Sequence, residues 1–198
     1  MLTHAIVFAL LGSAAAELTY PVKVKSDTTC VCTTVPCPVV GANYLTEGGG
    51  ALGTYTYIAQ GEDGETPVVS TVSVTITEAD LDMGTDTTSC TQEYSRSMDD
   101  DGTEDCDAGH ILAHRLGGPG NQPINIFPQD LSINRGIYST FEENIYYCFT
   151  KYDASSASLS WSFTYSDKTR TKPDSVTYTA KYSGGTCETT SEVFSNGE

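Results

Sequence analysis

The chain has 198 residues, with 10 basic and 26 acidic side chains and a formal net charge of −16 at pH 7. This length suits one domain with a sizeable core, and a hydrophobic content of 38% with 18 glycines excludes a disordered chain and a collagen-like repeat. The acidic balance argues against a broad basic surface that coats nucleic acid or an anionic membrane, while leaving room for a local basic cleft.

Residues 1–16 are predicted to be a secretory signal peptide. Residues 5–11 form a short apolar run, which ends in small residues from Gly12 to Ala16, the pattern of a signal-peptide cleavage site. The run is shorter than the roughly 20 apolar residues of a spanning helix, and no later stretch is apolar enough to cross a membrane. We expect a secreted, extracellular protein whose mature chain, residues 17–198, forms one domain.

Four stretches alternate between apolar and polar residues at period two and are rich in Val, Thr, Tyr and Phe. Such patterns are typical of half-buried antiparallel strands. Between the last two, Lys168, Arg170 and Lys172 form the densest run of positive charge in a segment that we expect to be an exposed hairpin loop. The predicted strands cover residues 54–58, 68–77, 159–165 and 176–182.

One segment, residues 133–147, is predicted to be a helix. Ile137, Phe141 and Ile145 recur there at four-residue spacing, and Cys148 follows where it can anchor the end of the helix. The expected fold class is therefore α+β, with antiparallel strands outnumbering helices.

Seven cysteines follow the predicted signal peptide, and an oxidising compartment converts most cysteines into disulfides. The spacings lack the paired C-x-x-C units of a zinc site. We expect the pairs Cys90–Cys106 and Cys148–Cys187, with one cysteine of the odd number left as a thiol or bridged to another chain.

Three motifs do not carry the chemistry that they suggest. Gly48 to Gly53 fits G-x-G-x-x-G, but a strand-like segment follows where a dinucleotide site needs a helix. The acidic run from Asp99 to Asp105 lacks the first ligand of a calcium loop, so we interpret it as solvated. Ile111, between two histidines four residues apart, occupies the position of the glutamate that a zinc protease requires.

Both histidines of the mature chain, His110 and His114, lie in one short segment. Histidine is the side chain best suited to accept a proton near neutral pH. Gly109 lets backbone or ligand approach His110 closely, and a long loop rich in glycine and proline follows. This segment is the candidate site.

The segment resembles the DNA/RNA non-specific endonucleases of the ββα-metal, or His-Me finger, superfamily. The family's D-x-G-H motif is present as Asp107-Ala108-Gly109-His110, followed at family-like spacing by Asn125-Ile126-Phe127-Pro128-Gln129. Leu131-Ser132-Ile133-Asn134-Arg135-Gly136 and then Glu142 come next in order. The resemblance implies a ββα-metal core over about residues 105–150.

The resemblance also implies a role for each matched residue. His110 would be the general base that activates water, and Asn134 would bind one Mg²⁺, or alternatively Mn²⁺. Glu142, two helical turns beyond Asn134 and on nearly the same face, would hold metal-bound waters. Asn125 and Gln129 would belong to the supporting shell.

Ala108 departs from the arginine that many family members carry between the Asp and Gly of the motif. Arg135 and Arg115 are the candidates to stabilise the phosphate in its place, although either one can equally be a surface arginine paired to a carboxylate. His114 either contacts a substrate phosphate or orients the loop. Asp107 is expected to fix the motif's backbone and partners rather than to bind the metal directly.

The sequence therefore predicts a secreted Mg²⁺-dependent endonuclease that hydrolyses DNA, and RNA as well, with little sequence specificity. Two alternatives remain open at this point. One is a catalytically inactive binding protein on a degenerate nuclease scaffold, which Ala108 and the charge of −16 favour. The other is a different metal-dependent phosphodiesterase that acts on small diesters. The oligomeric state is not predicted.

Overall fold

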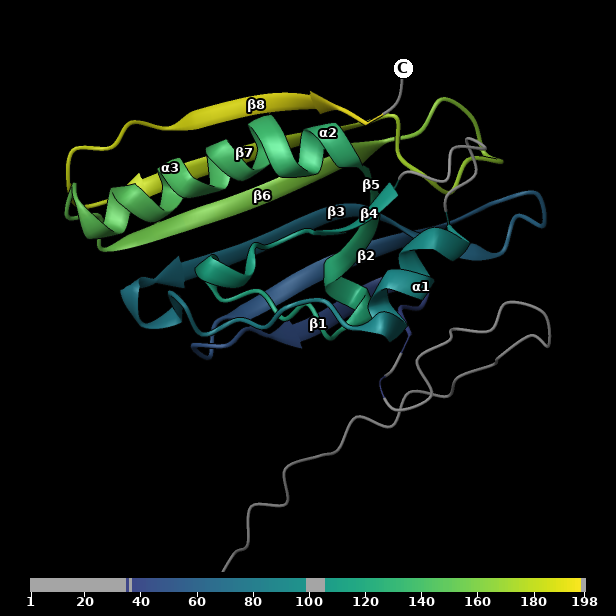
Figure 1. Ribbon diagram of the computed structural model, residues 1–198, viewed down its shortest axis with the longest axis horizontal. Helices are drawn as coiled ribbons and strands as arrows, with labels where there is room; N and C mark the ends of the chain where they lie inside the picture. The colour runs from purple at the N-terminus through teal and green to yellow at the C-terminus, as the bar shows by residue number, and fades with distance from the viewer. Residues whose placement is uncertain (1–34, 36, 99–105, 197–198) are drawn as a thin grey trace, which may run out of the picture.

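A computed structural model describes residues 35, 37–98 and 106–196. The predicted signal peptide and the acidic run from Asp99 to Asp105 lie outside the described residues. Six strands form one sheet in the order β1-β2-β3-β6-β7-β8, in which every neighbouring pair is antiparallel (Figure 1). The strands of this sheet are β1 Gly41–Thr46, β2 Leu52–Gln60, β3 Thr66–Thr77, β6 Ser156–Thr164, β7 Ser175–Ser183 and β8 Thr190–Ser195.

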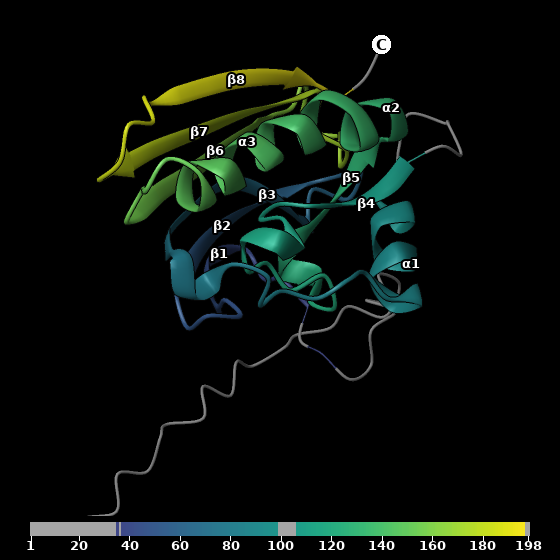
Figure 2. The same ribbon diagram turned by 60° about the vertical axis from the view of Figure 1, so that its left-hand side comes forward.

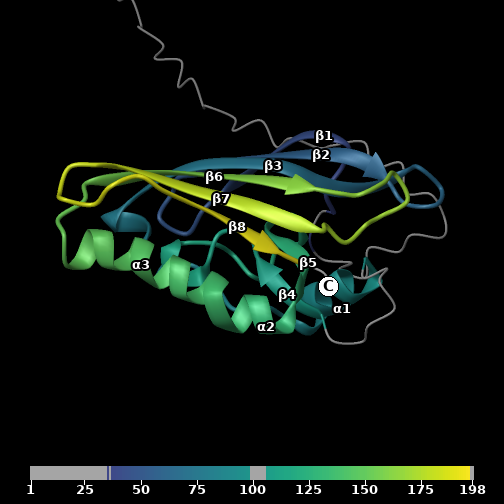
Figure 3. The same cartoon turned by 90° about the horizontal axis from the view of Figure 1, so that it is seen from above.

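The segments between β3 and β6 form a second layer, which covers one face of the sheet (Figure 3). This layer holds a separate two-stranded hairpin of β4 and β5, which is followed directly by the helical segments. Its elements are η1 Glu78–Asp80, α1 Ser89–Ser97, β4 Cys106–His110, η2 His114–Leu116, η3 Pro123–Asn125, β5 Ile126–Asp130, α2 Leu131–Ile133, η4 Asn134–Tyr138 and α3 Ser139–Thr150. The α+β class with antiparallel strands is thus confirmed.

The core lies between the two layers, because each long strand alternates between buried and exposed residues. All four predicted strands are confirmed as parts of β2, β3, β6 and β7, except that β6 ends at Thr164, one residue before the predicted end at Tyr165. Trp161 and Phe163 point inward from β6, and Phe141 and Ile145 meet the sheet from α3. Burial of aromatic and branched side chains of this size contributes about 1.5–3 kcal/mol each.

The predicted helix is longer than expected and is not regular. It begins at Leu131 after the N-cap Asp130, passes through a π-helical stretch from Asn134 to Tyr138, and ends at Thr150. The π-helical stretch and the non-helical dihedrals of Gly136 break the four-residue spacing. Ile137 is consequently 57% exposed, whereas Phe141 and Ile145 are buried as expected.

Helix α1 was not predicted. Its sequence is polar, and it begins with Thr88, whose side chain accepts a hydrogen bond from Thr91 N–H. Thr91 in turn accepts from the Thr88 backbone, although the usual partner in a capping box is Glu or Gln. The helix lies against the hairpin, where Tyr94 and Met98 pack with Ile126 (Figure 2).

The disulfides confirm one predicted pair and contradict the other. Cys148 and Cys187 are bonded, which ties the end of α3 to the turn before β8. The Cys90–Cys106 pair is wrong, because Cys106 is a buried thiol whereas Cys90 is disulfide-bonded. Lys172 also departs from the expected exposed basic loop, since it is only 2% exposed. None of the helices in the described residues is long and apolar enough to cross a membrane.

Candidate active site

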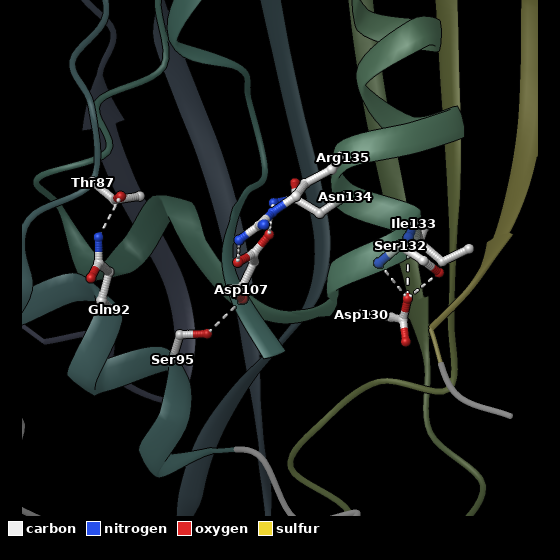
Figure 4. Close-up of polar contacts among 9 residues, drawn as sticks. All are labelled: Thr87, Gln92, Ser95, Asp107, Asp130, Ser132, Ile133, Asn134 and Arg135. Carbon is white, nitrogen blue, oxygen red and sulfur yellow. Dashed lines mark hydrogen bonds and ion pairs between the residues drawn. The ribbon is translucent and has the colours of Figure 1, made fainter. Parts of the chain in front are cut away.

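The β4–β5 hairpin places the two halves of the predicted site beside each other. In its register Asp107 pairs with Gln129, and His110 pairs with Ile126. The chain leaves β5 at Asp130, whose carboxylate caps the next helix by accepting hydrogen bonds from the backbone N–H of Ser132 and Ile133 (Figure 4). That immediate turn into a helix returns the chain toward the start of β4.

Asn134 and Arg135 both reach Asp107 (Figure 4). The Asn134 Nδ2 donates to Asp107 Oδ2 at 3.0 Å, and Arg135 binds both carboxylate oxygens, each at 2.8 Å. Partial burial acts to raise the pKa of Asp107, but the hydrogen bonds from Arg135 and Asn134 outweigh it, and the pKa lies below its ordinary value. Asp107 is therefore an anion at neutral pH.

Ser95 in α1 supports this arrangement, because its Oγ donates a hydrogen bond to the Asp107 backbone carbonyl at 3.1 Å (Figure 4). The neighbouring Ala108 packs with Tyr94, Met98 and Ile126 in the small cluster under α1. A long charged side chain at position 108 would enter this apolar cluster. The helix that sequence reasoning missed thus occupies the space beside the position where many relatives carry arginine.

His110 is half-buried, and one of its ring nitrogens is oriented by the backbone. Its Nε2 lies 3.1 Å from the carbonyl oxygen of Thr85. A carbonyl only accepts hydrogen bonds, so the neutral ring carries its proton on Nε2 and has its lone pair on Nδ1. Burial lowers the pKa of His110, although the bond to Thr85 acts in the opposite direction. The ring is therefore neutral at pH 7.

The segment of Thr85 and Asp86 supports both histidines and was missed by sequence reasoning. His114 Nδ1 lies 3.2 Å from Asp86 Oδ1, and the two histidine rings meet edge to face at a centroid distance of 6.5 Å. Gly120 donates from its backbone to Thr85, and a Cβ at Gly120 would lie 2.4 Å from His110 Nε2. Thr85 and Gly120 approach His110 with backbone atoms, so no side-chain motif signals these two contacts.

Arg115 contacts Tyr146 and Asp82. Its guanidinium lies over the ring of Tyr146, with 3.9 Å between the guanidinium carbon and the ring centroid, and its Nε is 3.6 Å from Asp82. The Tyr146 hydroxyl donates to the same Asp82 at 2.7 Å. Of the two arginines considered, Arg135 is the one that contacts the Asp107–Asn134 pair.

Asn125 and Gln129 are buried beneath the site, as expected for a supporting shell. Asn125 binds the Leu112 backbone twice, from Nδ2 to the carbonyl and from the Leu112 N–H to Oδ1. Gln129 packs against Gly109, where a Cβ would lie 2.3 Å from the Gln129 Oε1. This close approach explains the glycine in the D-x-G-H motif.

Glu142 lies close to the buried residues Tyr138 and Tyr178. Burial raises the pKa of Tyr138 and of Tyr178 well above the ordinary value, and the negative charge of Glu142 raises both further. Burial raises the pKa of Glu142 well above its ordinary value, and its buried Oε1 has no hydrogen-bond partner among the residues that the structure describes. Among the described residues no hydrogen bond joins Glu142 to Asn134, so its expected role at a metal remains a prediction.

The donor set suits a hard cation that keeps most of its waters. In residues 37–98 and 106–196 no three His, Cys, Asp or Glu side chains gather into a group that could hold a metal ion. Mg²⁺ often binds through one or two protein oxygens and several waters. The Asn134 Nδ2 is turned to the anionic Asp107, which leaves Oδ1 as the ligand oxygen, so these residues fit such an ion.

The chain is similar to known nucleases. The family of DNA/RNA non-specific endonucleases matches residues 57–184, which include the hairpin and the helix that follows it. A probable deoxyribonuclease, RhsA of Dickeya dadantii (strain 3937), is 33% identical over 127 residues, or 64% of this chain. The matched region is only 8% of that much longer protein.

Two solved structures of NucA from Streptococcus agalactiae are also similar to the chain. The one with a magnesium ion bound has a TM-score of 0.48 and 11% identity, covering 79% of this chain and 85% of NucA. The one with no metal bound has a TM-score of 0.48 and 14% identity, covering 83% and 84%. Because the family match spans well over half of the sequence, this chain belongs to the DNA/RNA non-specific endonuclease family.

Proposed function

We propose that this chain is a secreted, Mg²⁺-dependent endonuclease that hydrolyses phosphodiester bonds of DNA and of RNA with little sequence preference. Family membership supports nuclease chemistry. The single observation that carries the proposal is the hydrogen bond between Asn134 and Asp107, because it brings an amide oxygen ligand to the strand that also bears His110. The Cys148–Cys187 disulfide supports secretion, since disulfides persist mainly in oxidising compartments.

His110 acts as the general base in this proposal. Its Nε2 stays bonded to the Thr85 carbonyl, and its Nδ1 takes a proton from the water that attacks phosphorus. The lowered pKa keeps the ring neutral, and therefore able to accept that proton, at neutral pH. The bond to Thr85 strengthens as the ring becomes positively charged, which stabilises the product of the proton transfer.

Asn134 holds the cation through Oδ1, and Asp107 orients the Asn134 amide from its nitrogen side. A bound Mg²⁺ would neutralise charge on the phosphoryl oxygens and stabilise the leaving 3′ oxygen, and Mn²⁺ would serve in the same way. Glu142 is proposed to hold metal-bound water, because its buried, unpartnered Oε1 needs a hydrogen-bond donor. An amide ligand leaves the ion more positive than a carboxylate would.

Arg135 is proposed to stabilise the phosphate in place of the arginine that Ala108 replaces. Its side chain is 64% exposed although both Asp107 oxygens bind it, so N–H groups still face solvent. A guanidinium has five donors and binds phosphate in the same forked geometry as carboxylate. Arg115 is already stacked on Tyr146 and paired with Asp82, which makes it the weaker candidate.

The acidic surface limits how the chain binds its substrates. With a net charge of −16, we expect weak, salt-sensitive binding through phosphates near the site, because exposed charges farther than about 8–10 Å are screened at physiological salt. Such contacts carry no sequence information. The buried Lys172 contributes no exposed charge to this binding.

One feature favours the second candidate, an inactive binding protein on the same scaffold. The Asp107 carboxylate is fully engaged by Arg135 and Asn134, so a chain that has lost activity could keep this closed cluster for stability. His110 takes no part in that cluster and would have no reason to remain matched in such a chain, which makes the active nuclease the better account.

The deciding assay incubates supercoiled plasmid and single-stranded RNA with the oxidised mature protein, in Mg²⁺ or in EDTA. We expect cleavage in Mg²⁺ only, and its loss in Asn134→Ala. Glu143→Gln is the control, because Glu143 is an exposed carboxylate in the same helix whose side chain accepts a hydrogen bond from Tyr147. Absence of cleavage by the wild-type protein in Mg²⁺ or Mn²⁺ would favour the inactive scaffold, and turnover of small diesters alone would indicate a different phosphodiesterase.

A further inference from the structure

A buried carboxyl group lies behind the candidate site and is not used by the proposed chemistry. Glu47, directly after β1, is 2% exposed, and its Oε1 accepts a hydrogen bond from the Tyr55 hydroxyl at 2.8 Å. Its Oε2 is buried and has no hydrogen-bond partner within residues 37–98 and 106–196. A buried carboxyl with an unsatisfied oxygen costs free energy and calls for an explanation.

Tyr55 connects this carboxyl to the supporting shell of the site. The Tyr55 side chain is fully buried, and its hydroxyl lies 3.0 Å from Asn125 Oδ1 as well as 2.8 Å from Glu47. A phenol has one proton to donate. Glu47 and Asn125 therefore compete for one donor, and the protonation state of Glu47 determines which of them receives it.

Asn125 in turn fixes the backbone that follows His110. Its side chain binds both the N–H and the carbonyl of Leu112, and its backbone carbonyl accepts from Ile111 N–H at 2.8 Å. The Tyr138 hydroxyl donates to the Ile111 carbonyl at 3.2 Å. All four backbone polar groups of Ile111 and Leu112 are thus hydrogen-bonded, three of them to Asn125.

We infer that Glu47 is a positioning residue, which acts through Tyr55 and Asn125 on the backbone of Ile111 and Leu112 and thereby on His110. Neutral Glu47 can donate to the Tyr55 oxygen, so that Tyr55 donates to Asn125 and a continuous chain of hydrogen bonds reaches Leu112. Ionised Glu47 draws the Tyr55 proton to itself, since a hydrogen bond to a carboxylate is the stronger one. The inference rests on the proposed role of His110 as base.

The surroundings of Glu47 bring its ionisation near neutral pH. Burial raises its pKa to about 7, the hydrogen bond from Tyr55 acts to lower it, and the negative charge of Asp80 in η1 raises it. Tyr57 and Tyr178 are the other titratable groups that act on Tyr55, and both have a pKa well above 10 because they are buried. Glu47 is thus the group of this network that titrates between pH 6 and 8.

The kinetic test compares kcat and KM of the wild type, Glu47→Gln and Tyr55→Phe on plasmid DNA from pH 5 to 8.5. We expect the wild-type kcat to fall above pH 7 as Glu47 ionises, and this alkaline fall to vanish in Glu47→Gln, whose amide imitates the neutral acid. Tyr55→Phe should lower kcat by about tenfold or more with KM little changed, since a misplacement of about 1 Å can cost about 100-fold. A purely structural role would lower stability and leave kcat and its pH profile unchanged.

A second measurement needs no activity, and its main arm uses the wild-type protein alone. The backbone amide of Leu112, followed by NMR in wild-type protein, should change chemical shift with a midpoint near pH 7, and this titration should be absent in Glu47→Gln. If wild-type protein does not cleave DNA but the amide titrates, the proposed function fails and the coupling stands. If the amide does not titrate near pH 7, or if the variants keep the wild-type pH profile, the inference is overturned.

Discussion

Replacing Glu47 by Gln should change how stability depends on pH, by an amount that follows from the structure. The pKa of Glu47 rises from 4.5 to about 7 on folding, so the folded state binds more protons than the unfolded state between these values. The contribution of Glu47 to the free energy of unfolding therefore favours the folded state at low pH and is lost as pH rises toward 7. At 1.36 kcal/mol per pKa unit, the shift corresponds to about 3 kcal/mol.

The assay is urea unfolding of the two proteins at pH 4.5, 6, 7 and 8 with the disulfides kept oxidised. Other carboxylates titrate equally in both proteins, so the difference between their unfolding free energies isolates Glu47. Relative to Glu47→Gln, the wild type should lose about 3 kcal/mol from the lowest to the highest pH, with most of the loss complete by pH 7. If the difference between the two unfolding free energies stays constant within about 0.5 kcal/mol across this pH range, the reasoning is refuted, because Glu47 would then have the same pKa in the folded and the unfolded state.

Three further predictions follow from the site and its supports. The acidic limb of kcat/KM should have its midpoint below the ordinary pKa of about 6.5 for histidine, because burial lowers the pKa of His110; a midpoint above 6.5 on a pH–rate curve would contradict this. Arg135→Ala should reduce kcat by about 100-fold and Arg135→Lys should restore part of it, whereas equal activity of all three proteins would make the arginine a surface partner of Asp107 only. Replacing both Cys148 and Cys187 by Ser should lower the unfolding free energy by about 4 kcal/mol, given the 39-residue separation, as measured by denaturant unfolding.

The sequence predicted the parts of the fold that depend on local alternation. The strands around Tyr55, Val72, Trp161 and Tyr178 were predictable because one face of each is buried and aromatic or branched, while the other carries Ser and Thr. Helix α1 was not, because it is polar and only three of its residues are buried. Its tertiary contact with the β4–β5 hairpin, rather than local preference, accounts for it.

The candidate site was predictable where side chains carry the chemistry and unpredictable where the backbone does. The D-x-G-H segment pointed to Asp107 and His110, and the spacing to Asn134. The Thr85 carbonyl that orients His110 leaves no residue signature. The π-helical stretch from Asn134 to Tyr138 interrupts the regular helix between Asn134 and Glu142, and no pattern in the sequence marks it.

The central claim is that His110 supplies the base of a metal-dependent phosphodiester hydrolysis. The most direct test is the single-turnover rate of plasmid cleavage in Mg²⁺ by His110→Ala beside the wild type, with circular dichroism to show that both are folded. A general base contributes about 100- to 10,000-fold, so we predict a loss in that range. A folded His110→Ala protein that cleaves within about threefold of the wild-type rate would contradict the account.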